Sequence, residues 1–408
     1  MKLNKWTLGL AALGVVSLAS VVQAEEKANP VLTALSSTTI SGYVDTSVIW
    51  KIGRGNNGAL DGIGYNVKQA NGSSKMDGFN LNVVGLTIER PMDETEWAAG
   101  YKVDLLFGPD ADVYGTHITP STSQFAIKQA YVALRAPLGN GLNFKIGAYD
   151  NPLKYEAFES YKNPNYSHSY GYMISPNTFT GVEASYRFTD WMAMFGGVAD
   201  SIGDRINARG SHGNVIPENV KTYYGGITLT ATSDLGFLEG STLTAGAYDG
   251  LSPDGTATTR DTTGIFVGGT MNTPIKGLAV GGSWDYRIQR DDVNGQRGHI
   301  DDYDVAAYVV YSGIEKLKLA VRGDYYHCGQ PIATNPNIIY YPVSGQNVNN
   351  ELVAVTTTVD YQLWQNVVTR LEFRWDHDLT DNAPFGYPDP SAGDDNSFTL
   401  ALNVIYRF

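Results

Sequence analysis

Cysteine is almost absent from this chain of 408 residues, which contains only Cys328. A single thiol excludes a disulfide framework within one chain, and we interpret it as incidental rather than catalytic. Long hydrophobic runs are also missing after the first two dozen residues, whereas a membrane-spanning helix needs about 20 consecutive apolar residues. If the mature chain crosses a membrane, it must do so as a closed β-barrel, which satisfies its backbone polar groups in lipid.

The sequence also lacks the motifs of hydrolytic enzymes, both the G-x-S-x-G nucleophile elbow and the H-E-x-x-H zinc motif. Its six histidines fall in predicted loops or near strand ends, without metal-ligand spacing: His117, His168, His212, His299, His327 and His377. We therefore predict no catalytic residue, no metal site and no cofactor, and expect that the protein is not an enzyme. The net charge of −13 at pH 7 argues against a nucleic-acid partner.

The N-terminus has the three parts of a secretory signal peptide. Lys2 and Lys5 precede an apolar run over residues 6–22, and Val22-Gln23-Ala24 offers small residues at a cleavage site. A membrane anchor is the alternative, but the run contains glycine, serine and threonine and is short for a span. We expect cleavage after Ala24, a short periplasmic segment over 25–37, and a barrel over 38–408.

The last segment of the chain has the clearest period-two pattern. Polar Thr399, Asn403 and Arg407 alternate with an apolar face. This pattern predicts a β-strand with one face in an apolar medium. The apolar face consists of Phe398, Leu400, Leu402, Val404, Tyr406 and Phe408.

Similar segments recur along the chain, and two features favour a transmembrane barrel over a soluble sandwich. Connections alternate between short turns and long loops, as in outer-membrane barrels. Aromatic residues lie near segment ends, as interfacial girdles require, including Tyr43, Trp50, Trp97, Trp191 and Trp364. We predict an up-and-down antiparallel barrel of sixteen strands, with 14 or 18 as alternatives, and sixteen strands leave an aqueous channel. The long loops are expected near 53–76, 108–123, 151–177, 201–220, 250–261, 290–301, 329–350 and 378–395.

Several stretches resemble a known family. They are 100–112 (GYKVDLLFGPDAD), 127–134 (IKQAYVAL), 141–147 (GLNFKIG), 163–170 (NPNYSHSY) and 179–182 (FTGV). Together they resemble the OmpL-like β-barrel porins of bacterial outer membranes, the porin-2 type. The resemblance implies a pore for passive diffusion of small hydrophilic solutes and ions, in contact with outer-membrane lipid. The terminal strand ending in Phe408 resembles the signal read by the barrel-assembly machinery, and likeness to general porins suggests a homotrimer.

Charged residues on the polar faces of the predicted strands are candidates to line the pore. Lysine or arginine facing lipid at mid-depth would cost about 2–4 kcal/mol, so the lumen is the favourable side. Two interpretations stay open: the charges pair with one another and merely solvate the lumen, or they form a selectivity cluster. The candidates are Lys51, Lys102, Asp104, Lys145, Asp285, Arg287, Lys318, Arg322, Asp324, Arg370, Glu372 and Arg374.

The third long loop, 151–177, is rich in aromatic residues and resembles in place and size the inward-folded loop of classical porins. We expect it to form a constriction, with Glu156 and Glu159 facing basic residues of the wall. Tyr155, Phe158 and Tyr161 are the further constriction candidates. The alternative is a surface loop packed by its own aromatic side chains.

Two other functions are weighed. A substrate-specific sugar or peptide channel could use Tyr155, Phe158, Tyr340 and Tyr341 as a stacking track. A plugged structural or adhesive barrel is less favoured, because no separate plug domain is evident apart from residues 25–37. Acidic pairs such as Asp394-Asp395 lack a calcium-loop motif and are interpreted as solvated.

Overall fold

The computed structural model describes residues 38–52, 77–93, 95–114, 124–203, 205–210, 220–251, 260–293, 296–329, 350–380 and 394–408. The expected signal peptide and the 25–37 segment lie outside these residues. Within them, no helix is long and apolar enough to cross a membrane.

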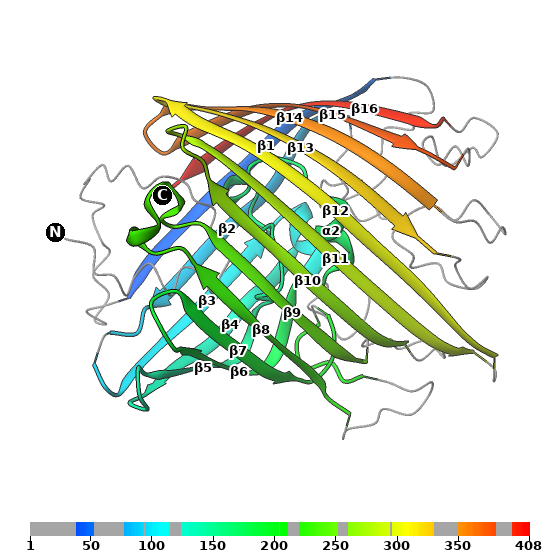
Figure 1. Cartoon of the computed structure of the whole chain (residues 1–408). Coiled ribbons are helices and arrows are strands. Elements are labelled where there is room, and N and C mark those ends of the chain that lie inside the picture. Colours follow the sequence, from blue (N-terminus) through cyan, green and yellow to red (C-terminus); the bar gives the residue numbers. More distant parts are fainter. Residues whose placement is uncertain are drawn as a thin grey trace.

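Sixteen strands form one closed barrel, in which each strand pairs antiparallel with its sequence neighbours (Figure 1). Closed sixteen-strand topology confirms the predicted fold class. The strands are β1 Thr39–Ile52, β2 Gly78–Arg90, β3 Ala98–Phe107, β4 Phe125–Ala136, β5 Leu142–Asp150, β6 Thr178–Arg187, β7 Met192–Ala199, β8 Thr222–Thr230, β9 Thr242–Leu251, β10 Arg260–Asn272, β11 Leu278–Val293, β12 Gln296–Ile314, β13 Leu317–Cys328, β14 Asn350–Trp364, β15 Val367–Asp378 and β16 Asn396–Arg407.

The barrel closes where the first strand meets the last. Gly42 N donates to Phe408 O at 2.9 Å, and Phe408 N donates to Gly42 O at 3.0 Å. A Cβ on Gly42 would lie 2.5 Å from the backbone oxygen of Gly85 and 2.6 Å from Cζ of the Phe408 ring, so glycine leaves room for both. The last residue of the chain is therefore built into the closing seam.

The two faces of the strands differ as the period-two pattern predicts. On β16, Phe398, Leu402 and Tyr406 are exposed on the outer face, whereas Thr399 and Asn403 are buried on the inner face. The apolar outer face contacts the lipid, and the polar inner residues face the lumen.

Tyr43 does not belong to the predicted aromatic girdle. Trp50, Trp97, Trp191 and Trp364 are exposed near strand ends, but Tyr43 is buried on the inner face of β1. Its position follows from the alternation itself, since odd residues of β1 point inward.

The predicted long loop over 290–301 is wrong. Strands β11 and β12 continue through most of this range and pair as far as Val293 and Gln296. Residues such as Arg290, Asp291 and Asp292 look like a loop because both faces are polar. Once a hairpin extends past the hydrophobic band, water can cover both of its faces, and the period-two signal disappears.

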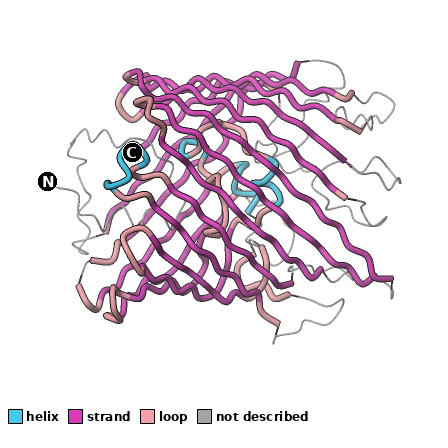
Figure 2. Tube along the Cα trace, in the orientation of Figure 1, coloured by secondary structure: helices cyan, strands magenta, loops and turns pink. Residues whose placement is uncertain are grey.

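Residues 151–177, called the inner loop below, connect β5 to β6. The loop contains the 3-10 turn η2 (Ser160–Lys162) and the short helix α2 (Tyr170–Ile174). Helix α2 contacts β11, β12 and β13, which the strand order places across the barrel from β5 and β6. Figure 2 shows helical segments within the outline of the strands. The inner loop therefore lies inside the barrel.

Candidate functional site in the barrel lumen

The inner loop touches the wall around most of its circumference. Leu153 packs in an apolar cluster contributed by β5 to β10. Ser160 Oγ donates to Asp45 Oδ2 on β1 at 2.7 Å, and Asn165 Nδ2 donates to Thr358 Oγ1 on β14 at 2.7 Å. These contacts spread over distant strands, so the loop crosses the lumen rather than lying along one side.

Glu156 is completely enclosed at the contact between the loop and the wall. Its Oε1 lies 3.0 Å from Arg322 Nη1 and accepts from Tyr308 OH at 3.0 Å, while its Oε2 accepts from Ser169 N at 2.8 Å. Burial alone would raise the pKa of Glu156, but Arg322, His168 and the Ser169 amide together lower it to about 2. Glu156 is therefore a carboxylate at neutral pH.

Glu159 connects the loop to β4. Its Oε1 lies 3.0 Å from Lys128 Nζ and 3.1 Å from Lys162 Nζ, and Lys128 also reaches Asp150 Oδ2 at 2.7 Å. Burial opposes ionisation, but the two ammonium groups outweigh it and hold the pKa of Glu159 below its ordinary value.

Arginines of β13 and β15 hold the backbone of the loop. Arg322 donates to Ser167 O at 2.6 Å and to His168 O at 2.8 Å. Arg374 donates to His168 O at 2.6 Å, and Arg370 donates to Ser160 O at 2.5 Å. These guanidinium groups satisfy carbonyls that would otherwise be buried without partners.

Glu372, on the same strand as Arg370 and Arg374, accepts hydrogen bonds from backbone N–H groups of the loop. Its Oε2 accepts from Tyr166 N at 2.6 Å, and its Oε1 accepts from Ser167 N at 2.9 Å. Loop donors and acceptors are thus both fixed by charged side chains of one strand, β15.

All the charged residues predicted to line the pore lie on the inner faces of their strands, where they divide into two groups. Buried ones are Asp104, Asp285, Arg322, Asp324, Arg370, Glu372 and Arg374. Partly exposed ones are Lys51, Lys102, Lys145, Arg287 and Lys318. The buried group contacts the loop or paired wall charges, so solutes can reach only the second group directly. Their effect on permeation stays a prediction.

The aromatic constriction candidates are engaged by the wall. Tyr155 OH lies 3.0 Å from Thr270 Oγ1, and the Tyr161 ring meets the Tyr43 ring edge-on at 4.9 Å. Phe158 is 4% exposed inside an apolar cluster with Tyr43 and its neighbours, so its faces are covered. Tyr340 and Tyr341 lie outside the described residues.

Sequence reasoning missed a polar network beneath the loop. Asp45 Oδ1 accepts from Asn82 Nδ2 at 2.6 Å and from Asn403 Nδ2 at 2.5 Å. Lys128, which holds Glu159, was missed as well. The available signal was a polar residue at an inward position of an alternating strand, but the pairing depends on barrel closure.

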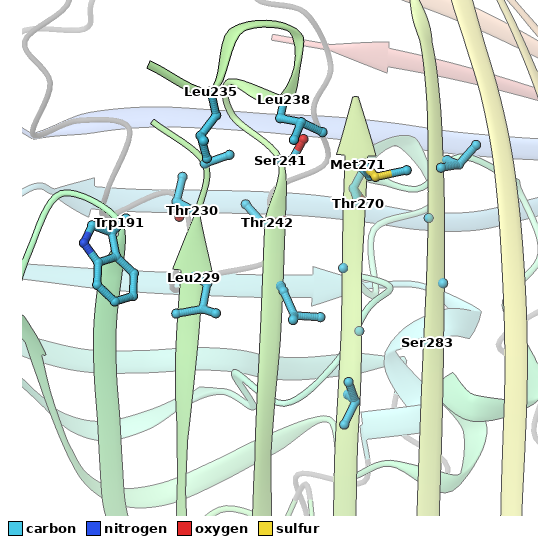
Figure 3. A pocket seen from close by; sticks show the side chains of 18 of the residues that line it. Trp191, Leu229, Thr230, Leu235, Leu238, Ser241, Thr242, Thr270, Met271 and Ser283 are labelled. Atoms are coloured by element: carbon cyan, nitrogen blue, oxygen red, sulfur yellow. The ribbon is translucent and has the colours of Figure 1, made fainter. Parts of the chain in front are cut away.

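A separate groove of about 860 Å³ lies on the outside of the barrel under the turn between β8 and β9 (Figure 3). Trp191, Leu243 and Met271 line it and are about half exposed. Leu243 and Met271 are on the outer faces of β9 and β10, and Trp191 lies in the turn before β7, so the groove faces lipid rather than the channel.

Comparisons with known proteins agree with this architecture. The family described as "Putative beta-barrel porin-2, OmpL-like" matches residues 37–408. No curated protein matches the sequence. The outer membrane channel DcaP of Acinetobacter baumannii aligns with a TM-score of 0.58 at 11% identity, covering 91% of this chain and 97% of that one.

Two further solved structures are similar. An anion-selective porin from Comamonas acidovorans aligns with a TM-score of 0.56 at 10% identity, covering 91% of this chain and 99% of its own. The trimer form of in-vitro folded OmpT from Vibrio cholerae aligns with a TM-score of 0.51 at 12% identity, over 91% and 99%. Identities this low show a shared fold, whereas the family match spans the whole barrel. The chain belongs to the OmpL-like beta-barrel porin-2 family and is an outer-membrane porin.

Proposed function

We propose that the protein is a water-filled pore for passive diffusion of small hydrophilic solutes, and that the inner loop sets its narrowest cross-section. The observation that carries this proposal is the course of the loop. It makes hydrogen bonds or ion pairs with β1, β2 and β4 and with every strand from β10 to β15. Any solute in the lumen must therefore pass beside it.

Water still reaches the lumen beside the loop. The side chains of Lys102, Lys145 and Lys318 keep about a quarter of their surface exposed, although each lies on the inner face of its strand. This residual exposure supports a narrowed aqueous passage.

Purified protein in planar bilayers tests the proposal. We expect stepwise currents that increase linearly with voltage and are not blocked by sugars or peptides. Deleting residues 156–162 should increase the single-channel conductance. The deletion removes Glu156 and Glu159, the two carboxylates that bind the loop to the wall, and the ring of Phe158 between them. Unchanged conductance in a correctly folded deletion variant would refute the role of the loop. Heat-modifiable migration on gels provides the folding control.

A plugged barrel is the second candidate, since most side chains of the inner loop are buried against the wall. It predicts a different result in the same experiment. The native chain would then give no channels, and the deletion variant would give large ones.

The remaining assignments belong to the same proposal. The protein acts without catalysis, residues 1–24 are removed during export, residues 25–37 form a periplasmic segment, and the barrel begins at residue 38. A homotrimer is supported by the trimer form of its structural neighbour OmpT. Mass spectrometry of the protein from outer membranes tests the cleavage, and its migration on non-denaturing gels tests the trimer.

A further inference from the structure

Near one end of the lumen, the lysine side chains are more exposed to water than most of the carboxylates with which they pair. At the end that carries the short turns, Lys102, Lys145 and Lys318 lie close to the ends of β3, β5 and β13. Arg407 ends β16, and Lys162 extends from the inner loop. These five residues are called the basic vestibule below. Short turns face the periplasm in outer-membrane barrels, so this is the periplasmic mouth.

Four lysines of the vestibule each have a carboxylate partner whose side chain is less exposed than their own. Side-chain exposures are 24% for Lys102 against 6% for Asp104, and 27% for Lys145 against 2% for Glu183. Lys162 is 32% exposed and Glu159 only 7%. Lys318 is 25% exposed against 12% for Asp360.

The carboxylates are covered because other donors share them. Asp104 accepts from Thr87 Oγ1 at 2.7 Å and from Gln129 Nε2 at 2.6 Å. Asp360 accepts from Arg370 Nε at 2.9 Å, in addition to its 3.1 Å contact with Lys318. A carboxylate shared in this way offers few free lone pairs to a passing ion.

The same holds for the remaining two acids. Glu183 accepts from Tyr224 OH at 3.1 Å, and Glu159 is shared between Lys128 and Lys162. Glu89 is the accessible acid among these pairs, 35% exposed and 3.6 Å from Lys102 Nζ. Within these pairs, Glu89 is therefore the one open carboxylate, against five accessible cationic side chains.

Aromatic rings connect the cationic side chains along the wall. Lys145 Nζ lies 5.8 Å from the centre of the ring of Tyr131, the residue opposite Lys102 in the pairing of β3 with β4. Lys162 Nζ and Arg407 Cζ lie 5.8 Å and 5.5 Å from the centre of the Tyr161 ring. Two of these groups therefore share the Tyr161 ring, and Lys318 reaches the same part of the loop by donating to Asn163 O at 3.4 Å.

We propose that the basic vestibule makes the pore prefer small anions, with carboxylates and phosphates as the natural solute class. This inference rests on the proposed function as a pore. The net charge of −13 points the other way. However, an ion in the lumen meets the ammonium groups at contact distance, and exposed charges beyond about 8 Å are screened at physiological salt.

The reversal potential in a potassium chloride gradient tests the preference. We expect chloride to permeate better than potassium in the native protein. Replacing Lys102, Lys145, Lys162 and Lys318 by glutamine should lower the permeability ratio of chloride to potassium about fivefold, the factor for one Coulomb contact near 4 Å in water. Exchanging chloride for acetate and then for phosphate compares the two anion types.

Two turn lysines provide the matched control. Lys276 and Lys316 are exposed at the same end of the barrel but sit on turns outside the lumen, so K276Q and K316Q should leave the ratio unchanged. Native channels that prefer potassium, or a preference that the four lumen substitutions leave intact, would overturn this inference while the pore itself stands. The absence of any channel would instead overturn the proposed function. If the fourfold variant does not fold, the single variants K102Q and K162Q are measured instead, and each should lower the permeability ratio of chloride to potassium.

Discussion

At the scale of single residues, the loop is held by charges that have no contact with water. Arg322 pairs with Glu156 at 3.0 Å and with Asp324 at 2.8 Å, and all three side chains are fully buried. Replacing one member of such a group leaves the other charges uncompensated, which costs more than the pair itself contributes. The wall and the loop are therefore energetically coupled at this point.

Arg322→Met should destabilise the folded barrel by about 3–5 kcal/mol, because Glu156 and Asp324 lose their buried counter-charge. Thermal unfolding followed by heat-modifiable gel migration measures the change. The double variant R322M/E156Q should lose less than R322M alone, since one uncompensated charge is removed. Additive losses would contradict a direct coupling of the two side chains.

The ionisation of Glu156 and Glu159 also determines the pH range in which the inner loop stays bound to the wall. The pKa of Glu156 is lowered to about 2, and that of Glu159 is also below its ordinary value. A depressed pKa in the folded state contributes stability that is complete above the ordinary carboxyl pKa, about 4.3, and that is lost as the pH falls towards the folded value. The contacts of these two carboxylates with the wall should thus persist from pH 7 to pH 5 and weaken only in more acidic solution. A conductance transition near pH 6 in bilayer recordings that E156Q or E159Q abolishes would contradict this assignment.

The sequence predicted which residues point inward but not which of them meet. Alternation placed Arg370, Glu372 and Arg374 on one face, and the structure has them there. Their hydrogen bonds to the loop backbone could not be predicted from the sequence. Every residue has the same backbone carbonyl and nearly always the same amide, so residue identity does not show which of them will be bonded. The contact between Asp45 and Asn403 joins residues 358 positions apart, and only barrel closure brings them together.

At the scale of elements, helix α2 depends on a close approach to the wall. A Cβ on Gly171 would lie 2.5 Å from Asp285 Oδ2 and 2.8 Å from Asp304 Oδ2. Ser169 caps the helix by accepting from Tyr172 N at 3.2 Å, so the position of its first turn is fixed. Glycine at residue 171 therefore leaves room for these two carboxylates, and a larger residue must displace them or the helix.

Gly171→Ala should displace α2 from β11 and β12 and increase the cleavage of the inner loop by added protease. Gly323→Ala is the matched control, because a Cβ there meets nothing within 4 Å. Limited proteolysis in detergent compares the two variants. Equal protection of both would show that α2 does not rely on this contact.

Element boundaries were predictable only where one face meets lipid. Strand β16 was predicted almost to the residue, because six apolar residues alternate along it. The extended hairpin of β11 and β12 was missed, since consecutive polar residues such as Arg290, Asp291 and Asp292 hide the period-two pattern there. The course of the inner loop depends on partners from many strands, and no local pattern encodes it.

At the scale of the whole molecule, the last residue has two separable roles. Its backbone closes the barrel with Gly42, and its ring covers that glycine on the outer face. Closure by backbone hydrogen bonds does not require an aromatic side chain, whereas recognition by the assembly machinery, which the resemblance of the terminal strand predicts, would require one. Substituting the side chain alone distinguishes the two.

Phe408→Ala should greatly reduce the amount of folded protein in the outer membrane of cells. The same variant should still refold in detergent, because the bonds to Gly42 use only the backbone of Phe408. Phe373→Ala is the matched control, since it removes a similarly exposed phenylalanine from the outer face of the neighbouring strand β15, outside the terminal strand. If both variants assemble equally well in cells, the terminal ring is not an assembly signal. If Phe408→Ala also fails to refold in detergent, the ring acts through the stability of the closing seam.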